Sequence, residues 1–410
     1  MIRKNRIPSA PLRLAMVVHG RFHAFDLSRE LIRQGVDLIL LTNYPKYVAQ
    51  RFGIPREKVI SCITHGLLSR LTDLGGHRCR ALFEPFLHRW FSRWAAGKLG
   101  SMDIKAIHAF SGVSEELMMA FLDRPVVKAM VRGSAHIRTQ GRLLEEEEAR
   151  SGQSIDRPSP WIIAREEREY KLADLLFVLS SFAYKSFEGE GAPAEKLRLL
   201  PLGSEVARFG ATAQDIEARC SRILAGEPLR ILTVGSFSLR KGALDLIEVA
   251  RRLKGRMKFL MVGDIESKRL RLMSGDNIEF LPRQPQSSLP AIYRKGDVFL
   301  FPTIEDGYAV VLAQAQAAGL LILATPNCAA PDIVQENTNG WILPIRNPGA
   351  FIERLEWCDA NREALAHMVR FTHETFRPRD WTDVASDLID AYMKALKASP
   401  QQNGIRLVHI

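Results

Sequence analysis

The chain has 410 residues, a length that suits two domains of about 150–200 residues each better than a single core. Hydrophobic residues make up 46% and charged residues 25%, which excludes a disordered or collagen-like chain. No uninterrupted apolar stretch approaches about 18 residues, so the sequence predicts no transmembrane helix. The apolar run behind the basic start is short, which argues against a cleaved signal peptide.

The cysteines are scattered and form no CxxC pair, which argues against a zinc site or a disulfide framework. Free thiols of this kind suit a reducing compartment, so we expect a cytoplasmic protein. The five are Cys62, Cys79, Cys220, Cys328 and Cys358.

The net charge of +11 lies in one part of the chain. Residues 1–100 carry 17 basic and 6 acidic side chains, whereas the two signs cancel over the rest of the chain. This surplus suggests an anionic partner, either nucleic acid or an anionic lipid surface, and a solvated basic face without a partner is the alternative. No nucleic-acid module is recognisable, so we expect no nucleic-acid partner.

Apolar strands followed by turns and helices recur through the first half of the chain. The segment 25–35 has helical spacing and ends at Gly35. Such a βαβ series predicts a parallel sheet with helices on both faces. The predicted strands are 12–20, 36–42, 104–110, 126–131 and 175–179.

The alternation of strands and helices is interrupted at residues 201–210, and a second βαβ series follows. Its predicted strands are 229–235, 258–263, 277–282, 298–302 and 321–325. We therefore expect an α/β protein of two Rossmann-like, doubly wound parallel-sheet domains that face a central ligand cleft. The expected domains are 10–210, joined by a closing amphipathic helix at 381–398, and 211–380.

Residues 79–98 do not fit this alternation of strands and helices. They carry a stripe of bulky aromatic side chains interleaved with arginines. Such a composition fits a helix that lies in a membrane interface. An ordinary core-facing helix with a basic outer face explains it equally well.

The segment 299–344 carries the strongest motif. It reads as a strand, a polar turn with Glu305, Asp306 and Gly307, a helix and a further strand. The start of that helix offers free N–H groups and a positive dipole end to a phosphate. Asp306 lies beside it and Gln314 a little over two turns on, where both can bind sugar hydroxyls.

This motif resembles the retaining, nucleotide-sugar-dependent glycosyltransferases of family 4, which have the GT-B fold. In that family a Glu-x7-Glu pair binds the transferred sugar and the nucleotide ribose, and the resemblance places Asp306 and Gln314 at the two positions. Both are conservative departures. The alternative register from Glu305 would put Ala313 at the second position.

The segment 231–253 resembles the strand, loop and helix in which this family holds the donor diphosphate with an Arg and a Lys. Lys241 aligns with the family lysine, and Ser236 stands where the arginine is common. Arg240, beside the lysine, is a plausible substitute. Two cations there would stabilise the charge that builds on the leaving diphosphate.

Two loops in the N-terminal half of the chain add candidate site residues. Gly20, in the loop 19–25, allows close approach of the backbone to a ligand on the acceptor side. His136, in the loop 131–140, is a candidate contact to the donor sugar, as in some relatives, and a structural role is the alternative. The predicted catalytic residues are thus Asp306, Lys241, Arg240 and His136. The predicted donor-binding residues are Gly20, Gly235, Ser236, Glu305, Gly307, Tyr308, Ala309 and Gln314.

The resemblance implies transfer of a sugar from a nucleoside diphosphate to an acceptor hydroxyl with retention, in polysaccharide or glycolipid synthesis. It implies no metal and no cofactor besides the donor substrate. The expected partners are the nucleotide sugar, a glycan or lipid-linked acceptor, and an anionic membrane surface at the inner face. A sugar-nucleotide epimerase of related fold, a phosphorylase, and a nucleotide-sugar-binding protein without turnover are the alternatives.

Overall fold

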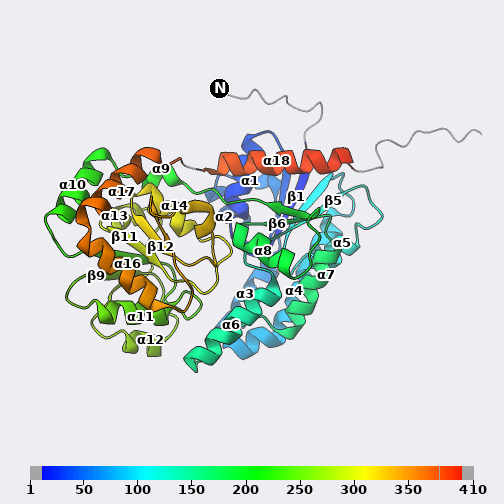
Figure 1. The fold of residues 1–410 in the computed structure, drawn as a ribbon. Coiled ribbons are helices and arrows are strands. Elements are labelled where there is room, and N and C mark those ends of the chain that lie inside the picture. The colour runs from blue at the N-terminus through cyan, green and yellow to red at the C-terminus, as the bar shows by residue number, and fades with distance from the viewer. Residues whose placement is uncertain (1–11, 378, 399–410) are drawn as a thin grey trace, which may run out of the picture.

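Two parallel β-sheets, one in each half of the chain, organise the computed structural model (Figure 1). The structure describes residues 12–377 and 379–398. The first residues of the predicted domain 10–210, and the basic start of the chain, lie outside the described residues. The predicted fold of two doubly wound domains is confirmed.

The N-terminal sheet has seven strands in the order β3-β2-β1-β4-β5-β6-β7, and every neighbouring pair is parallel. The five predicted strands are present, but the two edge strands were not predicted because three residues are too few for a periodic signal. The strands are β1 (Arg13–Val18), β2 (Asp37–Thr42), β3 (Val59–Ser61), β4 (Ala106–Phe110), β5 (Val127–Arg132), β6 (Leu175–Val178) and β7 (Leu197–Leu199).

The C-terminal sheet has six parallel strands in the order β10-β9-β8-β11-β12-β13. The three-residue edge strand β13 was likewise not predicted. The strands are β8 (Arg230–Val234), β9 (Lys258–Val262), β10 (Glu279–Leu281), β11 (Val298–Phe301), β12 (Leu321–Ala324) and β13 (Gly340–Ile342).

Helices cover both faces of each sheet, because the strands are apolar on both sides. Along β1, Leu14 and Met16 pack towards α1 and the last helix, α18 (Trp381–Ala398), and Ala15 and Val17 pack towards the layer that holds α4, α5, α7 and α8. The helices of the N-terminal half are α1 (Ala24–Arg33), α2 (Lys46–Arg51), α3 (Ile63–Leu74), α4 (Gly76–Leu99), α5 (Glu115–Met119), α6 (Ile137–Ser151), α7 (Pro160–Leu172) and α8 (Ser181–Gly189), with the short 3-10 helix η1 (Arg56–Lys58).

The second half is layered in the same way, with α10, α11, α16 and α17 on one face and α9, α13 and α14 on the other. Its helices are α9 (Val206–Phe209), α10 (Ala213–Leu224), α11 (Ala243–Arg252), α12 (Lys268–Met273), α13 (Leu289–Tyr293), α14 (Val310–Ala317), α15 (Ala330–Ile333), α16 (Pro348–Ala360) and α17 (Arg362–Thr375).

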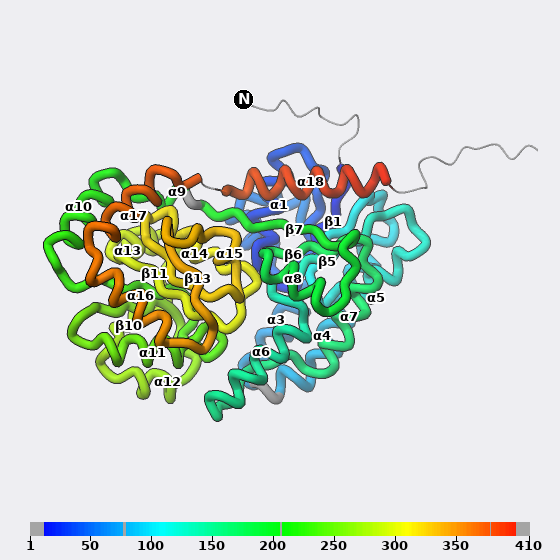
Figure 2. Tube along the Cα trace, viewed as in Figure 1, coloured from blue at the N-terminus to red at the C-terminus, as the bar shows by residue number. Residues whose placement is uncertain are grey.

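The last helix, α18, lies on the N-terminal domain (Figure 2). Its buried face, with Leu388 and Tyr392, packs in the same core as α1. At the crossing, a Cβ on Gly203 would lie 2.4 Å from the backbone of Asp380. The two segments that connect the domains therefore run in close backbone contact.

The aromatic stripe of residues 79–98 lies on α4 and divides between core and solvent. Leu87 and Phe91 are buried beneath the N-terminal sheet, and Trp90 and Trp94 pack partly against the same core. Leu82, Phe83 and Phe86 are exposed instead. The core-facing interpretation therefore holds for Leu87 and Phe91, and the membrane-interface interpretation of the exposed residues stays a prediction.

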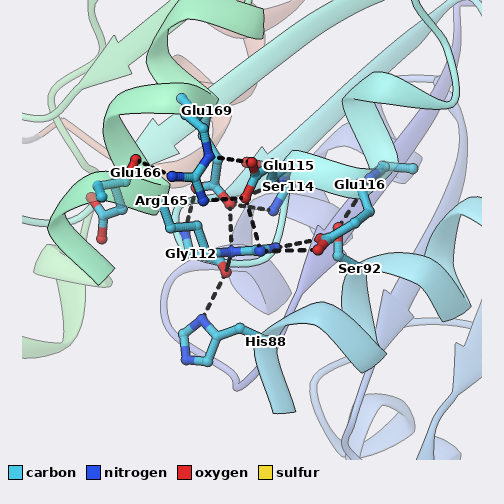
Figure 3. A network of polar contacts seen from close by, with 12 residues as sticks. His88, Ser92, Gly112, Ser114, Glu115, Glu116, Arg165, Glu166 and Glu169 are labelled. Atoms are coloured by element: carbon cyan, nitrogen blue, oxygen red, sulfur yellow. Dashed lines mark hydrogen bonds and ion pairs between the residues drawn. The ribbon is translucent and has the colours of Figure 1, made fainter. Parts of the chain in front are cut away.

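A buried polar network fixes the layer of α4, α5 and α7 (Figure 3). The fully buried Arg165 guanidinium donates to the carbonyl of Gly112 at 2.7 Å and pairs with Glu115 and Glu116. Glu169, one turn on along α7, accepts the N–H groups of Gly112 and Ser114. This network holds the loop after β4 in place behind the cleft-forming loops.

Candidate active site

A cleft of about 1050 Å³ lies between the two domains. Loops that follow β1, β5 and β6 line it from the N-terminal side, and loops that follow β8, β9 and β11 line it from the other. Ligands of doubly wound sheets bind at such carboxyl ends of strands. The volume is at the upper end for a small-molecule site, which gives room for two ligands together.

Seven of the predicted site residues line this cleft, and all of them belong to the C-terminal domain. They are Gly235, Ser236, Lys241, Asp306, Tyr308, Ala309 and Gln314. The structure places five others outside the lining, namely Gly20, His136, Arg240, Glu305 and Gly307.

Lys241 and Asp306 form an ion pair in the cleft, with Lys241 Nζ 2.5 Å from Asp306 Oδ2. The second carboxylate oxygen accepts the N–H groups of Tyr308 and Ala309 at 3.1 and 3.0 Å, just before α14 begins. Burial alone would raise the pKa of Asp306, but the charges of Lys241 and Arg240 outweigh it and lower that pKa. The aspartate is therefore an anion held in a fixed orientation.

Arg240 and Glu305 join the two domains beside this pair. Glu305 is fully buried, and its carboxylate lies 2.7 Å from the Arg240 guanidinium. It also accepts the N–H of Ala135 and the amide of Gln140, both at 3.0 Å and both from the N-terminal domain. Arg240 thus contacts Glu305 and is not among the residues that line the cleft, and its role as a diphosphate ligand stays a prediction.

The same cross-domain contact explains Gly307. A Cβ at this position would lie 2.1 Å from the carbonyl oxygen of Gly133 in the other domain. A side chain here would force the domains apart, so the glycine permits the close approach that forms the cleft.

His136 lies at the start of α6, where its ring accepts the N–H of Arg138 at 3.3 Å. The ring packs against Tyr170 and Phe187 and is buried. Burial lowers the pKa of His136 to about 4. Its surroundings match the structural alternative, and its proposed contact to a donor sugar stays a prediction.

The loop after β1 lines the cleft with the residues that follow Gly20 and not with the glycine itself. Gly20 has φ +130°, and its carbonyl accepts the Thr42 hydroxyl at 3.2 Å. The three residues that follow, Arg21, Phe22 and His23, line the cleft. The glycine therefore shapes the loop that reaches the cleft.

Two glycines after β8 and β9 open the C-terminal side of the cleft. Gly235 has φ +147°, and no atom lies within 4 Å of the position that a Cβ would take. At Gly263 a Cβ would lie 1.7 Å from the Gly235 carbonyl oxygen. Together these loops expose backbone beside Ser236 and Lys241, which is where a phosphate can approach.

Gln314 lies deeper, on α14, and is nearly buried. Its carbonyl oxygen accepts the hydroxyl of the fully buried Tyr293 at 3.1 Å, which fixes the orientation of the amide. Ala309, directly before the helix, has φ +64°, a backbone conformation that costs energy for any residue with a Cβ. The chain holds this strained turn at the lip of the site.

Several charged side chains that were not among the predicted site residues line the outer cleft. Arg21, Arg29 and Arg51 lie on the N-terminal side, and Asp264 and Arg283 lie on the C-terminal side. Arg283 and Asp264 follow β10 and β9 directly, so the rule that strand ends carry sites could have found them. Arg51 ends α2 and no local signal marks it.

Among residues 12–377 and 379–398, no group of three or more His, Cys, Asp or Glu side chains could hold a metal ion. Within the same ranges no helix is long and apolar enough to cross a bilayer. The expected absence of a cofactor and the expected location stay predictions.

Known proteins match the site-bearing part of the chain. Residues 228–361 match the family model described as glycosyl transferases group 1, and this region includes Lys241, Asp306 and Gln314. With its two facing domains, the chain has the GT-B glycosyltransferase fold. The predicted resemblance is confirmed at this level, and its family 4 and retaining details stay predictions.

Among curated proteins, the chain is 27% identical over 222 residues to a putative colanic acid biosynthesis glycosyltransferase of Salmonella typhimurium. The match covers 50% of each chain, so this chain spans about half the length of that relative. Among solved structures, Anabaena HepE in complex with UDP matches with a TM-score of 0.67, at 12% identity, over 93% of this chain and all of that one. Sucrose-phosphate synthase from Thermosynechococcus elongatus matches with a TM-score of 0.69, at 16% identity, over 95% of this chain and 100% of the other.

Proposed function

We propose that this protein is a retaining glycosyltransferase that moves a sugar from a nucleoside diphosphate donor to a hydroxyl of a growing glycan. The observation that carries the proposal is the Lys241–Asp306 ion pair beside the glycine loops of a large interdomain cleft. The colanic acid name of the Salmonella relative supports a role in cell-surface polysaccharide or glycolipid synthesis at the cytoplasmic face.

Each group of the site has a distinct task in this proposal. The Lys241 ammonium and the backbone at Gly235 and Ser236 hold the donor diphosphate and stabilise the charge that it gains on leaving. Asp306 accepts hydrogen bonds from hydroxyls of the transferred sugar, and Gln314 binds the ribose. No metal is invoked, because the lysine and the start of α14 supply positive charge.

The bond changes are those of same-face displacement. The acceptor oxygen bonds to the anomeric carbon on the face from which the diphosphate departs, and the bond from that carbon to the phosphate oxygen breaks. The acceptor proton passes to the departing phosphate oxygen. The anomeric configuration is therefore retained without a protein nucleophile.

An incubation with UDP-, GDP- and ADP-sugars tests the proposal. We expect release of nucleoside diphosphate only when an acceptor glycan is present, and NMR of the product should show the donor's anomeric configuration. Interconversion of the sugar without acceptor would indicate an epimerase. Binding without release would indicate a protein that has lost turnover, which the departures at Ser236 and Gln314 would then explain.

Asp306→Asn should lower transfer roughly 10- to 100-fold, and Gln314→Ala roughly 2- to 10-fold, because hydrogen bonds to a charged group are about twice as strong. Asparagine keeps an oxygen for the N–H groups of Tyr308 and Ala309, so the turn should survive. Tyr293→Phe is the control for Gln314→Ala, since it removes the same buried hydrogen bond without altering the cleft. Steady-state kinetics would measure all three, and a larger loss for Gln314→Ala than for Asp306→Asn would contradict the assigned roles.

Glu305→Gln should not be a neutral change, although Glu305 lies outside the cleft lining. The buried carboxylate joins Arg240 to the other domain, and an amide would leave that guanidinium without its anion. We expect a higher KM for the donor with a smaller change in kcat, because the closed arrangement of the domains forms less readily. An unchanged KM would show that the contact does not govern closure.

A further inference from the structure

The outward face of α3 is apolar and has no partner among the described residues. Ile63, Leu67, Leu71 and Leu74 follow one another at helical spacing, and their exposed fractions are 48%, 56%, 62% and 84%. The opposite face is buried, where His65 lies against the Leu87 carbonyl of α4 at 3.2 Å. The exposed leucines therefore form a surface and not a loosely packed core.

The first half of α4 extends this surface. Leu82, Phe83 and Phe86 are exposed by 76%, 38% and 55%, before the helix turns its apolar residues inward at Leu87. Seven of the 17 exposed large hydrophobic side chains among the described residues thus lie within residues 63–86. We call these seven the α3–α4 face. Such concentration on one helix pair marks an interaction surface, since scattered exposed leucines need no explanation.

The charged residues of α3 and α4 themselves are mostly basic, although Arg80 pairs with Asp156. Residues 63–98 contain six Arg and Lys against two acidic residues. Arg70 lies on the same side of α3 as Leu67 and Leu74, and Arg89 and Arg93 continue the line of Leu82 and Phe86 along α4. Arg89 and Arg93 are exposed.

We propose that the α3–α4 face docks on an anionic lipid bilayer. Exposed leucine and phenylalanine enter the boundary between headgroups and acyl chains, and the flanking arginines contact anionic headgroups. A second copy of the chain fits less well, because symmetric pairing would bring the two sets of cations together. Within the predicted segment 79–98, the membrane contact is thereby confined to the start of α4, because Trp90 and Trp94 pack partly against the core, and it extends to α3.

The position of this face in the fold gives the docking a consequence. Figure 1 shows α3 and α4 at the end of the N-terminal domain away from α18. The same domain supplies the Arg21–His23 side of the cleft. Docking would therefore hold the acceptor side of the molecule at the bilayer, where a lipid-linked acceptor resides.

Co-sedimentation with vesicles tests the proposal on the full chain. We expect binding to vesicles of phosphatidylcholine with phosphatidylglycerol, weak binding to phosphatidylcholine alone, and loss of binding at high salt. Leu74→Glu should lower the partition coefficient about tenfold or more, since it puts a charge where the docked leucine would contact the acyl chains. Arg89→Ala and Arg93→Ala should each lower it about fivefold on the anionic vesicles.

Leu272→Glu is the matched control, because Leu272 on α12 of the other domain is 81% exposed. It should leave vesicle binding unchanged. Equal binding of Leu74→Glu and the unmodified chain, equal binding to neutral and anionic vesicles, or no binding would overturn the proposal. A dimer in light scattering that Leu74→Glu dissociates would identify a second copy as the occupant and would also overturn it.

The outcome is separable from that of the proposed enzyme activity. Leu74→Glu should keep its melting temperature and its transfer to a water-soluble acceptor. A chain that binds vesicles but releases no nucleoside diphosphate would contradict the proposed function alone.

Discussion

Replacing Lys241 with alanine is expected to lower the rate of sugar transfer about 100- to 1,000-fold without unfolding the protein. A preorganised charge that stabilises a leaving group is worth roughly 2.7–4 kcal/mol of the barrier. Lys241 lines the cleft with its ammonium 2.5 Å from Asp306, on the same lip as Gly235 and Ser236. The loss should fall mainly on kcat, because the charge on the diphosphate grows towards the transition state.

Two variants make this result specific. Lys241→Arg keeps the positive charge and should retain more activity than the alanine variant. Lys254→Ala, at an exposed lysine of the same domain, should leave transfer unchanged. If purified Lys241→Ala kept more than about a third of the normal turnover, Lys241 would not hold the diphosphate.

Strand and helix order was largely predictable from the sequence because nine of the thirteen strands are mostly buried apolar runs, and the tenth predicted strand, β10, is marked by the apolar residues of 277–282. The three that were missed, β3, β7 and β13, have three residues each and lie at sheet edges, where pairing in three dimensions defines them. The closing helix was predictable as an element from its apolar spacing. Its packing beside α1 depends on contacts about 350 residues apart in the sequence.

In the site, too, local sequence patterns predict some features and contacts between distant segments decide the others. Lys241, Asp306 and Gln314 follow strand ends at motif spacing, and all three line the cleft. Arg240 and Glu305 lie one residue away from two of them, yet they turn to the opposite side and join the domains. Sequence spacing along a loop does not determine which side of the backbone a side chain takes. That choice depends on the Gly133–Ala135 segment of the other domain.

The exposed fraction of each side chain could not be predicted from the sequence either. Residues 79–98 look uniformly amphipathic, but α3 covers one side of α4 and leaves its first half uncovered. The leucines of α3 have the periodicity of an ordinary buried helix. Only the structure shows that this periodic face points outward.

Acidification from pH 7 to pH 5 is expected to destabilise the N-terminal domain by several kcal/mol. Six of its histidines have pKa values below the ordinary value of 6.5, mainly because burial disfavours the charged ring. They are His19, His23, His65, His88, His108 and His136. The pKa is lowered to about 4 at His23, His88 and His136, and to about 3 at His108.

The sign follows from proton binding. Between the folded and unfolded pKa values the unfolded chain binds more protons, so the free energy of unfolding falls as the pH falls. Each histidine with a folded pKa near 4 loses about 2 kcal/mol of stability between pH 7 and pH 5, or about 7 kcal/mol for four of them. Glu169 has the opposite effect on the free energy of unfolding, because burial raises its pKa to about 7. Its protonation between pH 7 and pH 5 offsets about 2 kcal/mol of the loss from the histidines.

The net loss of about 5 kcal/mol is comparable with the whole stability of a typical domain, so the N-terminal domain should unfold first. The described histidines of the C-terminal domain, His367 and His373, lie on α17 and are not buried. Urea unfolding at pH 7 and pH 5, followed by hydrogen exchange, would measure the loss and locate it. His108→Gln, which cannot take up a proton, should reduce the pH dependence by about 2 kcal/mol. Equal stability at the two pH values, or earlier unfolding of the C-terminal domain, would show that these rings gain protons without cost to the fold.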